Sequence, residues 1–356
     1  MPPPLEPVSL FRGPVRLMRE LRADVSGFPA FAFNAYAIAR GPGLLGGQVK
    51  AGTGVSFNRD RARVGAIGEA IERMAMAEPD GLSIHDARWT DVASRAPHPQ
   101  SLAPHASEEL ARFKALKPFD ESALLGWLSG TRIVDGAERL IPLGAVFPDT
   151  ARRLGQWWAP LMPNSHASGL TREGAIVHAL VEAVERDALM LAWAQRTIAR
   201  RLDLDAVAAD RAGAAKAVAA ARNAQLEIVV GDLTSDIGLP VCCAAILDAS
   251  GRGPRIVTGT GAGFDGAAAA ERAIEEAIQM RLRTVQLHRR GGEKALGRFA
   301  RWWNGDPTFA IDRLMGSPEE MVETTKRSMP DDDAGKINAL AKLLARVNVS
   351  PIVVET

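Results

Sequence analysis

The sequence has few cysteines, no strong excess of charge of either sign and no long hydrophobic run. Its only two cysteines, among 356 residues, are the neighbours Cys242 and Cys243. Neighbours on a strand point to opposite faces, so a disulfide between them is not expected. Two cysteines are also too few for a cysteine-rich zinc site. This cysteine usage fits a reducing cytoplasm.

The charge balance and the hydropathy argue against two further classes of protein. The formal net charge of +1 provides no electrostatic footprint for nucleic acid or for an acidic membrane surface. No apolar run reaches the roughly 20 residues that span a bilayer. The opening stretch MPPPLEPVSL lacks a basic segment followed by an apolar one, so no signal peptide is expected. We therefore expect a cytoplasmic protein that binds neither nucleic acid nor a membrane.

Glycine-rich nucleotide loops of the common kinds are also missing. The chain contains no GxxxxGK[ST] pattern, which excludes a P-loop. The stretch GTGAG at 259–263 precedes an expected helix, but it lacks the GxGxxG spacing of dinucleotide-binding proteins. We expect these glycines to serve a turn or close packing.

Strand-rich and helix-rich stretches do not alternate strictly along the chain, which favours the α+β class over a doubly wound sheet. The length suits one large domain or two ordinary ones. Residues 51–60 are expected to form a loop. The expected strands lie at 31–39, 226–233, 239–249 and 255–263, with a hairpin at 130–143. The expected helices cover 61–77, 172–196, 206–224 and 266–290.

One short acidic-basic phrase is written three times, each time within an expected helix that is otherwise almost entirely apolar or small. The copies are EAIER at 69–73, EAVER at 182–186 and EAIQMR at 276–281. Polar side chains spaced three or four residues apart share one helix face. The three polar stripes are Glu69 and Glu72 with Arg73; His178, Glu182 and Glu185 with Arg186; and Arg272, Glu276, Gln279 and Arg283.

These stripes need a source of positive charge. A helix that is apolar nearly all round is usually buried, and burying carboxylates without partners is costly. The flanking arginines supply part of the compensation, and a divalent cation is the other candidate, since Mg²⁺ commonly bridges carboxylates to substrate phosphates. Arginines would then hold phosphate oxygens. A single such phrase is commonly only a salt-bridged helix face, but three copies favour a shared metal–phosphate site.

Three longer stretches resemble the YcaO family of ATP-dependent enzymes, which activate peptide backbone amides. They are GTGVSFNRDRARVGAIGEAIER, NSHASGLTREGAIVHALVEAVERDALMLAW and GTGAGFDGAAAAERAIEEAIQMR. The stretches DLTSDIGLPV and LMLAW further resemble the azoline-forming branch, the SagD-like cyclodehydratase D proteins. The resemblance implies a YcaO-type α+β fold with mixed or antiparallel sheets and long buried helices that converge on an acidic nucleotide site.

The resemblance also implies a site for ATP and Mg²⁺ and assigns residues to it. The implied metal ligands are Glu69, Glu72, Glu182, Glu185 and Glu276. The implied ATP-binding residues are Asn164, Ser165, Arg73, Arg186, Glu69, Glu182 and Gln279, with the two arginines on phosphates. No catalytic residue is assigned, because the nucleophile in this family belongs to the substrate.

The chain departs from the family pattern in several places. Gly65 and Ser165 stand where the family favours Ser and Gly, and Thr53 stands where many members have Lys. The chain stops at Thr356, without the proline-rich end that often closes azoline-forming relatives. We expect an N-terminal segment at 1–44, a catalytic core at 45–290 and a C-terminal helical segment at 291–356 that is truncated relative to the family.

The implied reaction is ATP- and Mg²⁺-dependent cyclodehydration of a ribosomal precursor peptide, as in the biosynthesis of azole-modified bacteriocins. A Cys, Ser or Thr side chain attacks the preceding backbone carbonyl, whose oxygen is phosphorylated and lost as phosphate, leaving a thiazoline or oxazoline. The implied partners are the precursor peptide and a separate E1-like protein that binds its leader; relatives are often dimers, so a homodimer is expected. Two alternatives stay open: thioamide formation from a sulfide donor with a TfuA-type partner, and a non-catalytic scaffold subunit.

Overall fold

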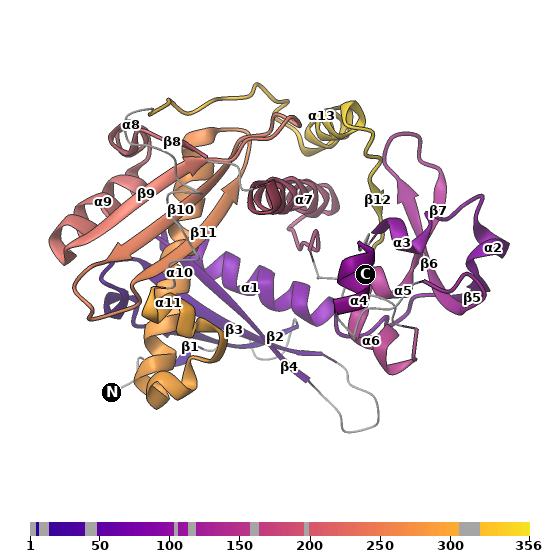
Figure 1. Ribbon diagram of the computed structural model, residues 1–356, viewed down its shortest axis with the longest axis horizontal. Coiled ribbons are helices and arrows are strands. Elements are labelled where there is room, and N and C mark those ends of the chain that lie inside the picture. The colour runs from indigo at the N-terminus through magenta and orange to yellow at the C-terminus, as the bar shows by residue number, and fades with distance from the viewer. Residues whose placement is uncertain are drawn as a thin grey trace.

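The structure, a computed structural model, describes residues 5–6, 14–39, 48–102, 106–112, 119–156, 164–195, 199–305 and 321–356. Within these ranges the strands form three antiparallel sheets, and long helices lie between them (Figure 1). This arrangement confirms the α+β class expected from the sequence.

The first sheet is a four-stranded meander that leads into a long helix. Its strands, in spatial order, are β1 (Leu5–Glu6), β2 (Val15–Leu21), β3 (Phe31–Ala39) and β4 (Gln48–Ser56), and α1 (Arg59–Ala75) follows. Asn58 caps α1, because its side chain accepts hydrogen bonds from the first-turn N–H groups of Asp60 and Arg61. The buried stripe Ala62, Ala66 and Ala70 packs α1 back onto β3 and β4.

The contact between β4 and α1 is unusually close, and two glycines permit it. A Cβ atom on Gly54 would lie 2.0 Å from the Ala62 carbonyl oxygen, and one on Gly52 would lie 2.2 Å from that of Ala66. Residues 51–56 are therefore strand, and the loop expected over 51–60 is wrong for this part. The glycines that suggested a flexible loop are required by packing instead.

A second sheet, later in the chain, repeats this construction. Its strands, in spatial order, are β8 (Arg200–Arg201), β9 (Leu226–Asp232), β10 (Val241–Asp248) and β11 (Ile256–Ala262), and α10 (Gly266–Gly291) follows. Two helices, α8 (Leu204–Asp210) and α9 (Ala212–Ala224), connect β8 to β9 along the chain. Asp265 caps α10 as Asn58 caps α1, and a Cβ atom on Gly261 would lie 2.4 Å from the Ala269 carbonyl oxygen. Close packing by the GTGAG glycines is confirmed; a turn there is not observed.

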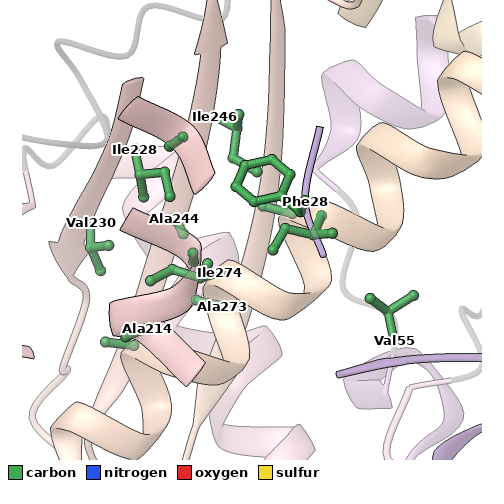
Figure 2. Close-up of a cluster of buried hydrophobic side chains, with 14 of the residues drawn as sticks. Phe28, Val55, Ala214, Ile228, Val230, Ala244, Ile246, Ala273 and Ile274 are labelled. Atoms are coloured by element: carbon green, nitrogen blue, oxygen red, sulfur yellow. The ribbon is translucent and has the colours of Figure 1, made fainter. Parts of the chain in front are cut away.

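Helix α10 is the central helix of the protein, because side chains from both the β1–β4 sheet region and the β8–β11 sheet bury it. Figure 2 shows the buried cluster around Ile274 of α10. Phe28 and Val55 come from the region of the first sheet, and Ile228 and Ile246 come from β9 and β10. All five side chains are at least nine-tenths buried. The position of α10 is therefore fixed by two sheets at once.

The other face of the β8–β11 sheet is covered by α7 (Arg172–Gln195) and α13 (Asp333–Arg346), as Figure 1 shows. The side chains of β10 alternate between the two faces: Cys242 packs with the α10 cluster and Cys243 with the α7 cluster. Both thiols are free, as expected, and burial raises the pKa of each.

The remaining sheet lies beside α7 on the right of Figure 1. It is formed by β12 (Ile352–Val353), β6 (Leu124–Arg132) and β5 (His85–Arg88), with β7 (Glu138–Pro142) also paired to β6. The shorter helices are η1 (Ala23–Ser26), α2 (Trp89–Val92), α3 (Pro99–Leu102), α4 (Ser107–Arg112), α5 (Leu143–Val146), α6 (Pro148–Arg153), η2 (Gly292–Ala295), η3 (Gly297–Phe299) and α11 (Ala300–Asn304). None of the helices in the described ranges is long and apolar enough to cross a membrane.

Replacing Gly54 with alanine tests the close strand–helix contact. The added Cβ would meet helix backbone, which cannot rotate away, so we expect Gly54→Ala to lower the free energy of unfolding by about 3 kcal/mol or more. Gly65→Ala is the matched control: its Cβ would meet nothing nearer than 3.8 Å, and alanine favours a helix by about 1 kcal/mol. Urea unfolding followed by circular dichroism measures both. Equal midpoints for the two variants would contradict the packing argument.

Candidate active site

The three repeated phrases lie on α1, α7 and α10, and the fold brings their glutamates together. Arg186 on α7 is the clearest meeting point. Its guanidinium nitrogens lie 3.5 Å from Glu182 Oε1, 3.6 Å from Glu185 Oε1 and 3.9 Å from Glu276 Oε1. The last of these contacts joins α7 to α10 across the edge of β11, at Thr260.

Glu276 is held by the backbone of β11. Its Oε2 atom accepts a hydrogen bond of 2.5 Å from the Thr260 N–H, and the Thr260 hydroxyl oxygen lies 3.0 Å from the same atom. The Thr260 hydroxyl also donates to Glu185 Oε1 at 2.6 Å. Thr260 sits between the two glycines that bring α10 close to the strand. A strand amide therefore positions a helix carboxylate at this point.

Glu69 on α1 is held in the same way by β4. Its Oε2 atom accepts a hydrogen bond of 2.5 Å from the Thr53 N–H, which again lies between two close-packed glycines. Its other oxygen accepts a hydrogen bond from Arg73, one turn later on α1. Arg73 also donates to the Ala51 carbonyl oxygen at 2.7 Å. The cradle at Glu69 thus matches the one at Glu276, each built by a Gly-Thr-Gly strand segment.

Glu72 is the least compensated carboxylate of the group. Burial, with the nearby charges of Glu182 and Glu69, raises the pKa of Glu72 to about 7, against the opposing effect of Arg73. Glu72 on α1 is thus close enough to Glu182 on α7 for the two charges to interact. Glu72 therefore marks the point where the site has more negative charge than its arginines neutralise.

The carboxylates of α7 are also shifted towards the protonated form. Burial raises the pKa of Glu182, although Arg186 opposes this, and burial together with the Glu276 charge raises the pKa of Glu185. Burial opposes the charge of Arg186, but the three carboxylates around it raise its pKa. A further cation that entered here would lower all these carboxyl pKa values.

The loop before α7 lies against this cluster. Ser165 adopts a left-handed backbone with φ of 64°, and its backbone lies close enough to Glu182 to lower the pKa of that carboxyl against the effect of burial. The hydroxyl of Ser168 donates to the Gly68 carbonyl oxygen of α1 at 2.9 Å, which ties the loop to both helices. Asn164 is exposed, and Gln279 is half-buried on α10; neither has a side-chain hydrogen bond among the described residues.

The donor set of the cluster fits Mg²⁺. It offers five carboxylates, from Glu69, Glu72, Glu182, Glu185 and Glu276, against the guanidinium groups of Arg73 and Arg186. Within the described ranges no three acidic, His or Cys side chains are close enough to chelate a metal ion as they stand. Mg²⁺ needs no such cage, because it commonly takes one or two carboxylates and completes its shell with water and substrate phosphates.

Some residues that shape the site were not among those assigned to it from the sequence, although Thr53 and Arg272 were noted there. Thr53 and Thr260 act through backbone N–H groups, which no side-chain pattern predicts; the repeated Gly-Thr-Gly was the available signal. Arg272 donates to the Ala262 carbonyl oxygen at 2.9 Å and lies within electrostatic range of Glu185. Glu275 points the other way from Glu276: it is buried and accepts hydrogen bonds from the Ser56 hydroxyl and the Phe57 N–H, at 2.6 and 3.2 Å.

The raised pKa of Glu72 predicts how the ligand-free protein responds to pH. The folded state holds the Glu72 proton up to about pH 7, whereas the ordinary value is 4.5, so stability from this group falls as pH rises between these values. Allowing for solvent screening, this fall in the free energy of unfolding is on the order of 1 kcal/mol, and we expect Glu72→Gln to remove it. Urea unfolding at pH 5 and pH 8, without ATP or Mg²⁺, compares the variant with wild type. Equal pH dependence in the two proteins would contradict the assignment.

Two relatives resemble the chain in sequence. An uncharacterized protein from Methanothermobacter thermautotrophicus is 27% identical over 338 residues, which is 90% of this chain and 80% of that protein. An uncharacterized protein in the tfuA 3′ region of Rhizobium leguminosarum bv. trifolii is 30% identical over 170 residues, 45% of this chain and 39% of that protein.

Solved structures share the fold. A heterocyclase in complex with substrate and cofactor superposes with a TM-score of 0.81 at 18% identity, covering 98% of this chain and 48% of its own. The chain thus spans about half of that heterocyclase. YcaO from Methanopyrus kandleri, bound with AMPPCP and Mg²⁺, gives 0.60 at 20% identity, covering 95% and 80%. The E. coli microcin synthetase McbBCD complex with pro-MccB17 bound gives 0.62 at 14% identity, covering 95% and 84%.

The family profile that matches is described as the YcaO cyclodehydratases, which bind ATP and Mg²⁺. It matches residues 52–356, which is most of the chain and includes all three glutamate helices. The resemblance noted in the sequence is therefore confirmed. The protein is a member of the YcaO family, whose cofactors are ATP and Mg²⁺.

Proposed function

We propose that the protein uses ATP and Mg²⁺ to cyclodehydrate Cys, Ser or Thr residues of a ribosomal precursor peptide to thiazolines or oxazolines. The observation that carries this proposal is that, in a YcaO chain, glutamates of α7 and α10 meet at Arg186 while Glu72 of α1 lies within electrostatic range of Glu182. The carboxylates outnumber the arginines, which leaves net negative charge that Mg²⁺ would neutralise. The heterocyclase of the same fold supports the reaction class.

Particular residues would hold each ligand. Glu69, Glu72, Glu182, Glu185 and Glu276 would bind Mg²⁺, and Arg73 and Arg186 would contact phosphate oxygens. Bound ATP supplies the phosphoryl group that turns the amide oxygen into a leaving group. The loop residues Asn164 and Ser165, together with Gln279, would border the nucleotide. Because the arginines are already in place, they would stabilise developing charge without reorganising.

The peptide and its delivery are proposed to involve other chains. We propose that a separate E1-like protein binds the leader of the precursor peptide. The McbBCD complex with pro-MccB17 bound, whose fold this chain shares, supports a multi-protein arrangement of this kind. We also propose that the protein is a homodimer.

A second reaction is favoured by one specific observation. The Rhizobium relative is named for its position in the tfuA 3′ region, which supports the alternative in which sulfide attacks the activated amide and a thioamide forms. The nucleophile changes in this alternative, but the ATP and Mg²⁺ site does not. The two reactions leave different masses on the peptide.

Calorimetric titration of ATP tests the shared site first. We expect Mg²⁺-dependent binding that weakens about tenfold or more in Glu182→Ala and in Glu69→Ala, because each variant loses a half-buried ligand. Glu173→Ala, also on α7 but with a side chain that is 45% exposed beside Arg172, is the matched control and should bind normally. If the wild-type chain binds no ATP, the scaffold alternative is favoured and the proposal fails.

Mass spectrometry of a precursor peptide co-expressed with this chain and its leader-binding partner tests the reaction. Loss of one water per modified residue is the expected result, and it should disappear in Glu182→Ala. Exchange of one oxygen for sulfur would identify the thioamide reaction instead. An unmodified peptide, in the presence of the partner and of a chain that binds ATP, would count against both reactions.

A further inference from the structure

A second polar pocket lies at the far end of α10, away from the candidate active site. Its cavity volume is about 350 Å³, and it is enclosed by the end of η1, the junction of α9 and β9, the turn after β10 and the last turns of α10. Arg289 in its wall stands about 20 Å along the helix from Glu276. Arg281 in its wall is rotated about 140° around the helix from Glu276. The two sites are therefore separate.

The inner wall of the pocket is a buried ion pair. Arg281 donates to Asp248 Oδ2 at 2.6 Å, to the Ser26 carbonyl oxygen at 2.8 Å and to that of Pro254 at 3.0 Å. Both members of the pair are more than nine-tenths buried. A guanidinium has five N–H donors, so these three acceptors leave two donors of a fixed, buried arginine for a ligand.

The outer wall carries an excess of positive charge. Arg22 is paired with Asp24 at 2.8 Å, just as Arg281 is paired with Asp248. Arg252 and Arg289 also line the pocket; both are exposed, and neither has an ion-pair partner among the described residues. The pocket therefore holds two neutral pairs and two uncompensated guanidinium groups.

The backbone of the pocket wall is strained at one position. Gln225, which ends α9, has φ of 57°, a left-handed conformation that glycine adopts at lower cost. Among the described non-glycine residues, only Ser165, Gln225 and Asn348 have positive φ, and Ser165 lies in the candidate active site. Strain of this kind is often retained where a ligand is held.

We propose that this pocket binds a small organic phosphate, of the class of sugar phosphates. A phosphate monoester carries nearly two negative charges at neutral pH and three acceptor oxygens, which match the two uncompensated guanidinium groups and the free donors of Arg281. The cavity exceeds the size of a bare phosphate and leaves room for an organic body. This inference does not depend on the reaction proposed above.

Titration of ribose 5-phosphate at low ionic strength tests the pocket. We expect the double variant Arg252→Gln/Arg289→Gln to bind at least about tenfold more weakly than wild type, because both charge-assisted contacts are lost. The charge-matched control is Arg290→Gln/Arg301→Gln, two exposed arginines outside the pocket, and it should bind like wild type. Binding of ATP with Mg²⁺ should be unchanged in both double variants, which shows that they are folded.

The remaining arms decide what is recognised. Ribose without phosphate should not bind, and inorganic phosphate should bind more weakly than ribose 5-phosphate. Absence of binding to the wild-type chain overturns the proposal, and so does equal weakening in the two double variants, which would reflect net charge alone. Inorganic phosphate binding as tightly as ribose 5-phosphate overturns the assignment of an organic ligand.

Discussion

The structure depends on how closely a helix can approach the strand that precedes it. In β4–α1 and in β11–α10 the approach requires glycine on the strand and alanine on the helix, because a single Cβ at Gly54 or Gly261 would meet helix backbone. The approach brings a strand N–H within hydrogen-bonding distance of a glutamate on the helix, at Thr53 and at Thr260. The positions of two key carboxylates are thus set by backbone contacts, which are far stiffer than contacts between side chains.

The charge of the site follows from the same packing. The carboxylates cannot move away from one another, since their helices are held against two sheets. Arg73 and Arg186 neutralise only part of the negative charge. Burial raises the pKa of Glu72, Glu182 and Glu185, and neighbouring carboxylates add to this effect at Glu72 and Glu185. The repulsion between the carboxylates is unfavourable when the site is empty and is relieved when cations bind. The packing of the fold therefore favours cation binding.

Local patterns predicted the long helices well, because helix period and apolar stripes act over a few residues: α1, α7 and α10 lie within about two residues of their expected bounds. The single helix expected over 206–224 is wrong, since it is divided into α8 and α9 at Arg211. The repeated phrases likewise predicted the glutamates that meet at Arg186. The strand at 51–56 was missed, because its glycines are needed for a contact with a helix that only the folded chain forms. The stripe spacing did select Glu276, which faces Arg186, over its neighbour Glu275, which binds Ser56.

The burial of Cys242 and Cys243 on opposite faces of β10 has a consequence for handling thiol-bearing substrates. They are the only cysteines in the sequence, and both are shielded from solvent and held as thiols, so neither can readily attack a disulfide or be captured by one. A cysteine-containing peptide would therefore meet a surface that offers no competing thiol. Alkylating reagents added to such a mixture would report the redox state of the peptide alone, and a cysteine introduced at the surface would carry a label at one defined place.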